Sequence, residues 1–238
     1  MSGGVIVVLS VNEPIKIDVW SDIACPWCYI GKRNLESGIA VAAPPADAPV
    51  VEVTYHSYEL SPDTPVDFDG SEIDFLAGHK GMPAEQVKQM LENVTGVAAN
   101  AGLEYNFDIL KHTNTVKAHE LLHFAKEQGV QPEMMERLMR AYFTEGSHVG
   151  RVEDLAVLAS EVGLDADATR EALTSGRFTA AVRADQAQAQ AYGINGVPFF
   201  VIDGKYGVSG AQPAEAFTQI LQQVWEERGT AASEPEMA

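Results

Sequence analysis

The feature that most constrains the fold is a pair of cysteines placed between two segments of different hydrophobic period. Residues 15–20 (IKIDVW) alternate apolar and polar side chains, which predicts a strand with one buried face. Cys25 and Cys28 follow in the sequence CPWC, and residues 28–43 then carry apolar side chains at helical spacing. Residues 50–60 (VVEVTYHSYEL) alternate again. These segments predict a βαβ unit with the cysteines at the junction of its first strand and its helix.

The segment 63–193 is predicted to be helical almost throughout. Pro83 is placed to open one helix, Asn114 to cap the next, and Pro132 to begin a third, while glycines separate the helices that follow. Acidic residues in this segment, Glu72 among them, are expected on solvated faces. The sequence shows no repeat of fixed period, so a solenoid is disfavoured.

The end of the chain changes period once more. Residues 197–210 (VPFFVIDGKYGVSG) contain two apolar runs around an Asp-Gly pair, which predicts a strand hairpin. An amphipathic helix is expected to start at Pro213. The predicted fold is therefore α/β, with the order βαβ, a large all-α insertion, then ββα. The expected units are a discontinuous domain of residues 14–62 and 194–228, a helical insertion of residues 63–193, and a disordered tail of residues 229–238.

The net charge limits the classes of binding partner, and the first residues bear on the location of the protein. Lys and Arg number 16 against 34 Asp and Glu, and the formal charge of −18 would repel nucleic acid phosphates and anionic membrane surfaces. The first residues lack the basic region and long apolar core of a secretory signal, and no stretch approaches the roughly 20 apolar residues of a membrane span. We therefore expect a cytoplasmic protein without nucleic acid or membrane partners. Because the cytoplasm is reducing, the two cysteines of this chain are not expected to form a structural disulfide. They are expected to be catalytic, redox-sensing or metal-binding.

The CPWC sequence has a physical reason to be reactive. Unpaired backbone N–H groups and the helix dipole at a helix N-terminus stabilise an anion, so this position favours the thiolate form of Cys25. Pro26 suits the first helical position, and Cys28 lies one turn on, close enough to form a disulfide with Cys25. The redox interpretation, with Cys25 as nucleophile and Cys28 as resolving thiol, is preferred. A structural zinc site lacks further cysteine ligands, and an inert pair remains the third alternative.

Four longer stretches carry a resemblance to a known family. They read WSDIACPWCYIGKRNLE, NTVKAHELLHFA, AYFTEGSHVG and GVPFFVIDGKYGVSGAQPAEAF, and the resemblance that they carry extends over about residues 15–217. In these stretches the chain resembles the FrnE-like branch of the DsbA family, which are oxidoreductases with a thioredoxin fold and a helical insertion. The resemblance implies the same fold and a thiol-disulfide oxidoreductase or isomerase activity.

The resemblance also implies which residues contact a substrate. Pro198 matches the cis-proline that faces the dithiol in thioredoxin folds, and the backbone of Val197 would then pair with an extended substrate next to Cys25. The alternative is a trans proline that only begins a strand. Pro26 and Trp27, between the two cysteines, are expected to contact the substrate, and Trp27 is expected to be exposed.

A second motif suggests different chemistry. His119, Glu120 and His123 fit the HExxH pattern of zinc proteases, in which two histidines one turn apart hold the metal. The following residues lack a third histidine at the expected position, and the family resemblance does not require the glutamate, so no metal site is predicted. The preferred interpretation is that His119 and Asn114 line a groove between the insertion and the thioredoxin domain. The alternative is a buried structural histidine.

The predicted activity is thiol-disulfide exchange on a disulfide-containing protein or small molecule. This chemistry requires no bound cofactor, and glutathione or a thioredoxin system would supply the electrons. One alternative is a glutathione-dependent isomerase of the hydroxychromene-carboxylate isomerase type, although those proteins usually carry Ser where this chain has Cys25. Another is a metal-binding or chaperone-like module. The sequence does not decide the oligomeric state, and a homodimer is one of the states that it allows.

Overall fold

The structure is a computed structural model that describes residues 13–42 and 50–233. One sheet is formed by β1 (Ile15–Ser21), β2 (Val51–Ser57), β3 (Phe199–Ile202) and β4 (Tyr206–Ser209). The helices of the described residues are α1 (Pro26–Val41), α2 (Glu72–Lys80), α3 (Ala84–Asn100), α4 (Val116–Glu127), α5 (Gln131–Phe143), α6 (Val152–Glu161), α7 (Ala166–Thr174), α8 (Thr179–Ala191) and α9 (Ala214–Ser233). None of these helices is long and apolar enough to cross a membrane.

The sheet has the strand order β2-β1-β3-β4, with β1 in an inner position. β1 and β2 run parallel, and the pairs β1–β3 and β3–β4 run antiparallel. The parallel pair needs a crossover, which α1 supplies, whereas β3 and β4 need only a tight turn. Asp203 and Gly204 form that turn with positive φ values of 55° and 66°, so the predicted hairpin is confirmed.

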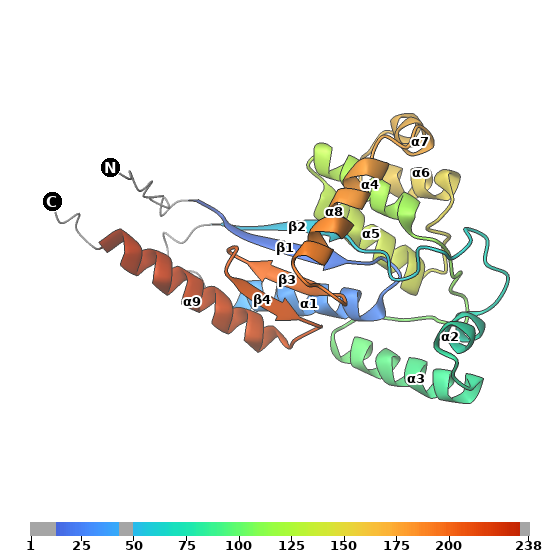
Figure 1. Cartoon of the computed structure of the whole chain (residues 1–238), viewed down its shortest axis with the longest axis horizontal. Helices are drawn as coiled ribbons and strands as arrows, with labels where there is room; N and C mark the ends of the chain where they lie inside the picture. Colours follow the sequence, from blue (N-terminus) through green and yellow to red (C-terminus); the bar gives the residue numbers. More distant parts are fainter. Residues whose placement is uncertain (1–12, 43–49, 234–238) are drawn as a thin grey trace.

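Successive side chains of β1 point to opposite faces of the sheet and therefore belong to two different hydrophobic clusters. Ile17 and Val19 belong to the large core that also contains residues of α1 and α9, whereas Trp20 packs with Ala189 of α8. Figure 1 shows α9 running along the β3–β4 side of the molecule and the helices α4 to α8 gathered at the other end. The sheet is therefore covered on both faces, as a central strand that is buried on both sides requires.

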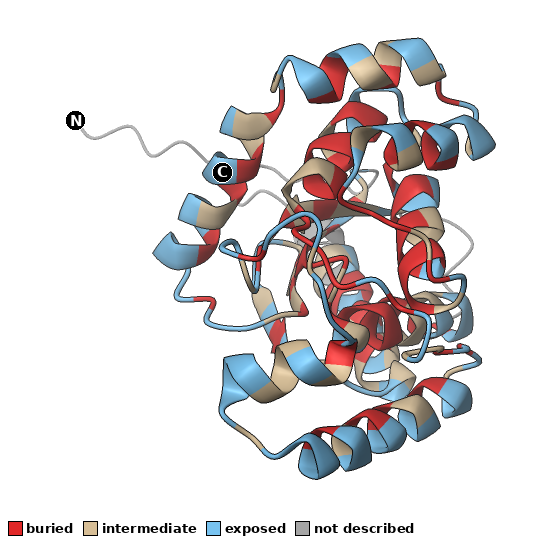
Figure 2. Cartoon of the chain, turned by 90° about the vertical axis from the view of Figure 1, so that its right-hand side faces the viewer, coloured by how far each residue is buried: buried red, intermediate tan, exposed pale blue. Residues whose placement is uncertain are grey.

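Seven helices, α2 to α8, lie between β2 and β3 in the sequence, which confirms an α/β fold with a helical insertion. Their buried residues lie on the sides that face neighbouring elements, and their exposed residues lie outward (Figure 2). The lower pair in Figure 1 is α2 and α3, of which α3 contacts α1 and α2 contacts α3. The residue at which an insertion domain would begin or end stays a prediction.

Three expectations about single elements are corrected. The helix α2 was not among the predicted helices, although Ser71 and Asp74 form a capping box at its start, and Glu72 in its first turn is buried rather than solvated. Thr115, not Asn114, is the N-cap of α4. The helix α9 continues to Ser233, past residue 229 where the tail was expected to begin. Residues 234–238 lie outside the described residues.

Candidate active site

The two cysteines lie at the start of α1, as the sequence predicts. Cys25 is the N-cap residue with an extended backbone (φ −90°, ψ 113°), and Pro26 occupies the first helical position. The amide of Cys28 donates to the carbonyl of Cys25 at 3.0 Å, which closes the first turn. Both cysteines are free thiols and largely buried, whereas Trp27 between them is 45% exposed, as expected. The two thiols are therefore largely shielded from solvent, whereas Trp27 is exposed. Cys25 also lines the cavity that is described below.

The loop before β3 approaches the first cysteine. The Val197–Pro198 peptide bond is cis, in agreement with the expectation, and Cys25 Sγ donates to the carbonyl of Val197 at 3.7 Å. The close packing of this loop on α1 requires a glycine, because a Cβ at Gly31 would lie 2.9 Å from Cγ of Pro198. The fold thus brings Val197 and Pro198 to Cys25 across more than 170 residues of sequence.

The two thiols differ in their surroundings. Burial and then the hydrogen bond and charge of the neighbouring Cys25 sulfur raise the pKa of Cys28 well above its ordinary value. A thiol with a raised pKa keeps its proton, and it can therefore donate a hydrogen bond to a neighbouring thiolate. Cys28 is therefore the thiol that holds its proton more tightly than an ordinary cysteine does.

An acidic residue that the sequence reasoning missed lies directly behind the dithiol. Asp22 is buried, and its carboxylate accepts hydrogen bonds from the amides of Leu60 at 2.8 Å and Ala24 at 3.3 Å. Burial alone would raise the pKa of Asp22, but the contacts with His119 and with the Leu60 amide outweigh it and hold the pKa below its ordinary value. Its position three residues before Cys25 was the available sequence signal.

The expected groove residues lie elsewhere. His119 is fully buried, with Nε2 at 3.4 Å from Asp22 Oδ1, so it is a buried partner of that acid. Asn114 donates to the carbonyl of Pro62 at 2.8 Å and accepts from the amide of Val116, so it fixes the start of α4. Neither side chain is among the described residues that line the cavity beside the dithiol, which corrects the groove prediction.

The HExxH motif does not form a metal site in this structure. His119 faces Asp22, whereas His123 Nε2 lies 3.1 Å from a carboxylate oxygen of Asp185. Glu120 is buried and accepts a hydrogen bond from Thr179. Within residues 13–42 and 50–233, no group of three or more His, Cys, Asp or Glu side chains is placed to hold a metal ion. The two histidines of α4 therefore contact different carboxylates.

A cavity of about 550 Å³ lies beside Cys25. Pro26 and Trp27 of the CPWC turn form part of its wall, and α2 and α3 form much of the rest. Apolar side chains of those two helices line it: Phe75, Leu76, Met90, Leu91, Val94 and Val97. Its volume lies in the range of small-molecule sites, and Cys25 is accessible from it.

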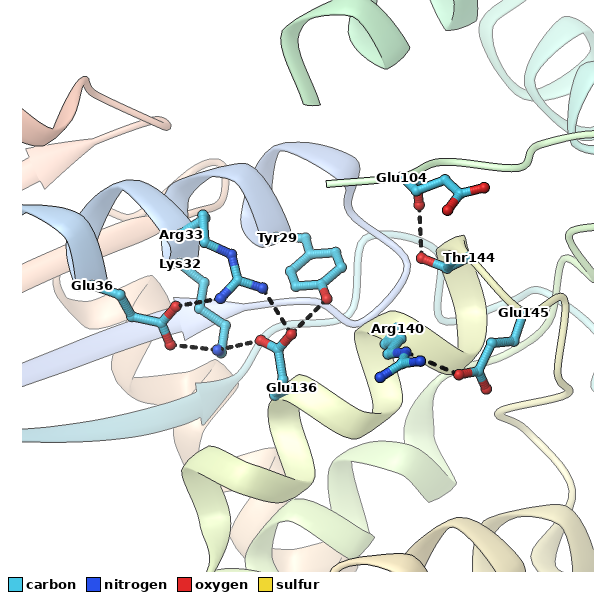
Figure 3. Close-up of polar contacts among 9 residues, drawn as sticks. All are labelled: Tyr29, Lys32, Arg33, Glu36, Glu104, Glu136, Arg140, Thr144 and Glu145. Atoms are coloured by element: carbon cyan, nitrogen blue, oxygen red, sulfur yellow. Dashed lines mark hydrogen bonds and ion pairs between the residues drawn. The ribbon is translucent and has the colours of Figure 1, made fainter. Parts of the chain in front are cut away.

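Distant residues hold the turn that carries the dithiol. The hydroxyl of Tyr105, in the segment between α3 and α4, donates to the carbonyl of Pro26 at 2.6 Å. On the other side of α1, Glu136 of α5 accepts from the Tyr29 hydroxyl at 2.7 Å and from Lys32 at 2.5 Å (Figure 3). Arg33 reaches the same carboxylate at 2.8 Å. None of these contacts was predicted, because their partners lie about 80 to 110 residues apart in the sequence.

Comparisons with known proteins agree with this geometry. The model of the DSBA-like thioredoxin domain family matches residues 16–222. The uncharacterized protein YwbO of Bacillus subtilis is 30% identical over 211 residues, which are 87% of this chain and 96% of YwbO. A crystal structure of a probable DsbA oxidoreductase from Streptomyces coelicolor is 39% identical, with a TM-score of 0.82 and 94% of each chain covered.

A more distant structure shares the fold alone. The cytosolic disulfide reductase DsbM from Pseudomonas aeruginosa is 16% identical, with a TM-score of 0.61 over 89% of this chain and 99% of DsbM. A second structure of DsbM holds glutathione. The expected DsbA relationship is thereby confirmed, while the FrnE-like branch within it stays a prediction. By its sequence match over most of its length and by its fold, the chain belongs to the family of DSBA-like thioredoxin domain proteins, the DsbA-type thiol-disulfide oxidoreductases.

Proposed function

We propose that the protein reduces or isomerises disulfide bonds, with Cys25 as the attacking thiolate and Cys28 as the resolving thiol. One observation carries the proposal: Cys25 is the N-cap of α1, lies on the cavity wall, and contacts the Val197 carbonyl at 3.7 Å. A substrate sulfur that reaches Cys25 would have the Val197 backbone beside it as a hydrogen-bonding edge. Pro198, Pro26 and Trp27 would then form the surface around the exchanging sulfurs.

The exchange proceeds in two steps. The Cys25 thiolate attacks one substrate sulfur, the substrate S–S bond breaks, and the second substrate sulfur leaves as a thiolate that takes a proton. Cys28, once deprotonated, attacks Cys25 Sγ and releases the first substrate sulfur, leaving a Cys25–Cys28 disulfide. Two electrons have then passed from the dithiol to the substrate. Glutathione as a co-substrate, or a thioredoxin system, would restore the dithiol, and no bound cofactor takes part.

We also propose a cytoplasmic location. DsbM, which shares the fold, is named a cytosolic disulfide reductase. In a reducing compartment the dithiol form of the protein is maintained, which favours reduction or isomerisation of substrates over net oxidation.

Single-cysteine variants test the assigned roles. Cys28→Ser should accumulate a mixed disulfide between Cys25 and one half of a model peptide disulfide, because the resolving step is removed. Cys25→Ser should accumulate none and should lose insulin reduction. Intact-protein mass spectrometry after acid quenching measures the amount of adduct on each variant. Trapping through Cys28 in Cys25→Ser at the rate of the other variant would contradict the assignment.

The same experiment separates the alternative functions. A glutathione-dependent isomerase would turn over its substrate with glutathione while the redox state of Cys25 stayed constant. A metal-binding module would carry stoichiometric zinc that Cys25→Ser abolishes, with no insulin reduction by the wild type. Redox cycling of the dithiol during turnover, followed by alkylation, supports the oxidoreductase over both.

A further inference from the structure

One long face of α3 borders the cavity beside Cys25. The residues of α3 that line the cavity recur at helical spacing: Gln86, Gln89, Met90, Leu91, Asn93, Val94 and Val97. From residue 86 to residue 97 a helix rises by about 16 Å. The wall that α3 contributes is therefore elongated along the helix axis.

The polar part of this face is open to a ligand and carries no charge. Gln86, Gln89 and Asn93 are exposed, so a bound molecule can reach their carboxamides. Each carboxamide has N–H groups that donate and an oxygen that accepts. The charged residues of α3 all lie outside the cavity lining: Glu85, Lys88 and Glu92. The helix therefore presents an uncharged face with hydrogen-bonding groups of both kinds.

Apolar side chains that are open to solvent gather at the same cavity. Trp27 and Leu60 are each 45% exposed and Val97 is 40% exposed, and all three belong to the lining. Single exposed apolar residues are ordinary, whereas several that share one cavity mark a binding surface. The expected ligand therefore has apolar groups as well as hydrogen-bonding groups.

The dimensions of the cavity select an extended chain. A helix about 10 Å across that lay along 16 Å of this wall would occupy about 1,250 Å³, more than twice the 550 Å³ of the cavity. An extended polypeptide rises by about 3.3 Å per residue, so about five residues span the same length. A single cysteine-sized group would contact only a small part of it.

An extended chain also matches the chemistry around the dithiol. Its backbone offers N–H and C=O groups along its whole length, which the carboxamides of α3 can pair with. The carbonyl of Val197, at 3.7 Å from Cys25 Sγ, provides a backbone acceptor beside the reacting sulfur. Both sets of groups suit the same kind of ligand.

We propose that Gln86, Gln89 and Asn93 of α3 bind an extended, uncharged segment of about five residues beside the disulfide-bonded cysteine of a polypeptide substrate. The inference rests on the proposed function and specifies its substrate class. Cys25 attacks the substrate sulfur, the substrate S–S bond breaks, and two electrons come from the dithiol, which a low-molecular-weight thiol such as glutathione restores. The three carboxamides bind the substrate and take no part in the exchange.

A pair of substrates of different length tests the role of the flanking residues. N-acetylcysteine amide, and an uncharged peptide with apolar side chains and about five residues on each side of its cysteine, are both prepared as 2-thiopyridyl mixed disulfides. Release of 2-thiopyridone by the reduced protein in stopped flow gives the two rate constants, and dithiothreitol corrects for their intrinsic reactivity. The corrected rate constant should be at least about 5-fold larger for the peptide, because apolar side chains are buried. Equal corrected rate constants, or a faster reaction of the shorter substrate, would overturn the proposal.

Two identical substitutions on α3 test where the segment binds. Asn93 and Asn100 are both exposed, and only Asn93 lines the cavity. The substrates are peptides that differ by Glu or Lys at one position, which is moved through both flanks of the cysteine. Asn93→Lys should raise the ratio of the Glu rate to the Lys rate by at least about 2-fold at one or more positions. Asn100→Lys lies about 10 Å further along the helix and should shift the ratio less in salt of about 0.15 M.

The ratio of two rates within one protein is independent of the fraction of that protein that is folded and reduced. A loss of folding in either lysine variant therefore leaves the comparison valid. Equal shifts in Asn93→Lys and Asn100→Lys, or no shift in either, would overturn the assignment to this face of α3.

The outcomes also separate this inference from the proposed function. If the wild type reduces insulin but shows neither the length dependence nor the effect of Asn93→Lys, the substrate class is wrong and the oxidoreductase remains. If the wild type reduces neither insulin nor the mixed disulfides and its dithiol does not cycle, the proposed function itself fails.

Discussion

At the scale of single residues, Tyr105 shows how a distant side chain shapes the dithiol turn. Its hydroxyl donates to the Pro26 carbonyl at 2.6 Å, and its ring stacks on Phe143 with centroids 4.7 Å apart. This contact holds the Pro26 carbonyl, in the first turn of α1, in place. The backbone N–H groups of the same turn stay free to stabilise a thiolate at Cys25. Tyr105 is thus a positioning residue for the proposed reaction.

Tyr105→Phe removes only that hydroxyl. The variant should lower the free energy of unfolding by about 0.5 to 1.5 kcal/mol, measured by urea denaturation, because one buried hydrogen bond is lost. A looser turn stabilises the thiolate less, so the dithiol should also become more reducing in glutathione buffers. The control Tyr192→Phe alters an exposed side chain and should change stability by less than about 0.5 kcal/mol. Equal effects of the two variants on the potential would exclude a positioning role.

At the scale of elements, α1 is fixed between α5 and α9. Gly38 permits contact with α9, because a Cβ there would lie 2.7 Å from the Ala214 carbonyl oxygen. On the α5 side, Lys32 is nearly fully buried between Glu36 and Glu136, at 2.5 Å from each carboxylate. Burial raises and these contacts lower the pKa of Glu136, with a net shift below its ordinary value. The cluster is a polar anchor for the helix that carries the cysteines (Figure 3).

Glu136 and Glu145, both labelled in Figure 3, offer a matched pair of substitutions that tests the contribution of this cluster to stability. Glu136→Gln should destabilise the protein by about 1.5 to 3 kcal/mol, because charge-assisted hydrogen bonds from Tyr29 and Lys32 are weakened. Glu145→Gln removes ion pairs with Arg137 and the exposed Arg140 and should cost about 0 to 1 kcal/mol. Urea denaturation near neutral pH measures both. Comparable losses would mean that the cluster on α1 is worth no more than a surface ion pair.

At the scale of the whole molecule, one histidine links three elements. His56 of β2 lies between Asp18 of β1, at 2.8 Å, and Asp185 of α8, at 3.0 Å. His123 of α4 contacts Asp185 as well, so the sheet and the helical insertion share one charge network. Burial lowers the pKa of His56, but the hydrogen bonds that its ring makes to the carboxylates of Asp18 and Asp185 outweigh this effect, and the net shift is upward.

The sign of this shift predicts a pH dependence. A raised pKa in the folded state means that the stabilisation by protonated His56 is fully present below the unfolded value of about 6.5 and is lost as pH rises through the folded pKa. The difference in unfolding free energy between wild type and His56→Gln should therefore be larger at about pH 5.5 than at about pH 8.5. The control is His79→Gln, the same substitution at an exposed histidine, measured at the same two pH values. A difference for His56→Gln that grew with pH would contradict this assignment.

The agreement between sequence and structure is greatest where interactions are local. Alternation over residues 15–20 and the Asp-Gly pair at 203–204 predicted strands and a hairpin because the period and the turn conformation depend on neighbouring residues alone. The capping box of α2 was also a local signal, and Ser71 with Asp74 could have predicted this helix, which the sequence analysis missed. The N-cap of α4 was predicted at Asn114, one residue before its observed position at Thr115. Helix boundaries are commonly uncertain by one or two residues.

The sequence by itself determined where the dithiol lies, because a Cys-Pro-Trp-Cys segment between a predicted strand and a predicted helix places its first thiol at the helix N-terminus. Only the tertiary structure decided what surrounds it. Asp22 and His119 meet as a buried pair, and His112 enters the cavity wall, through contacts between segments far apart in the sequence. Such contacts depend on how helices pack, a property that hydrophobic periodicity does not encode.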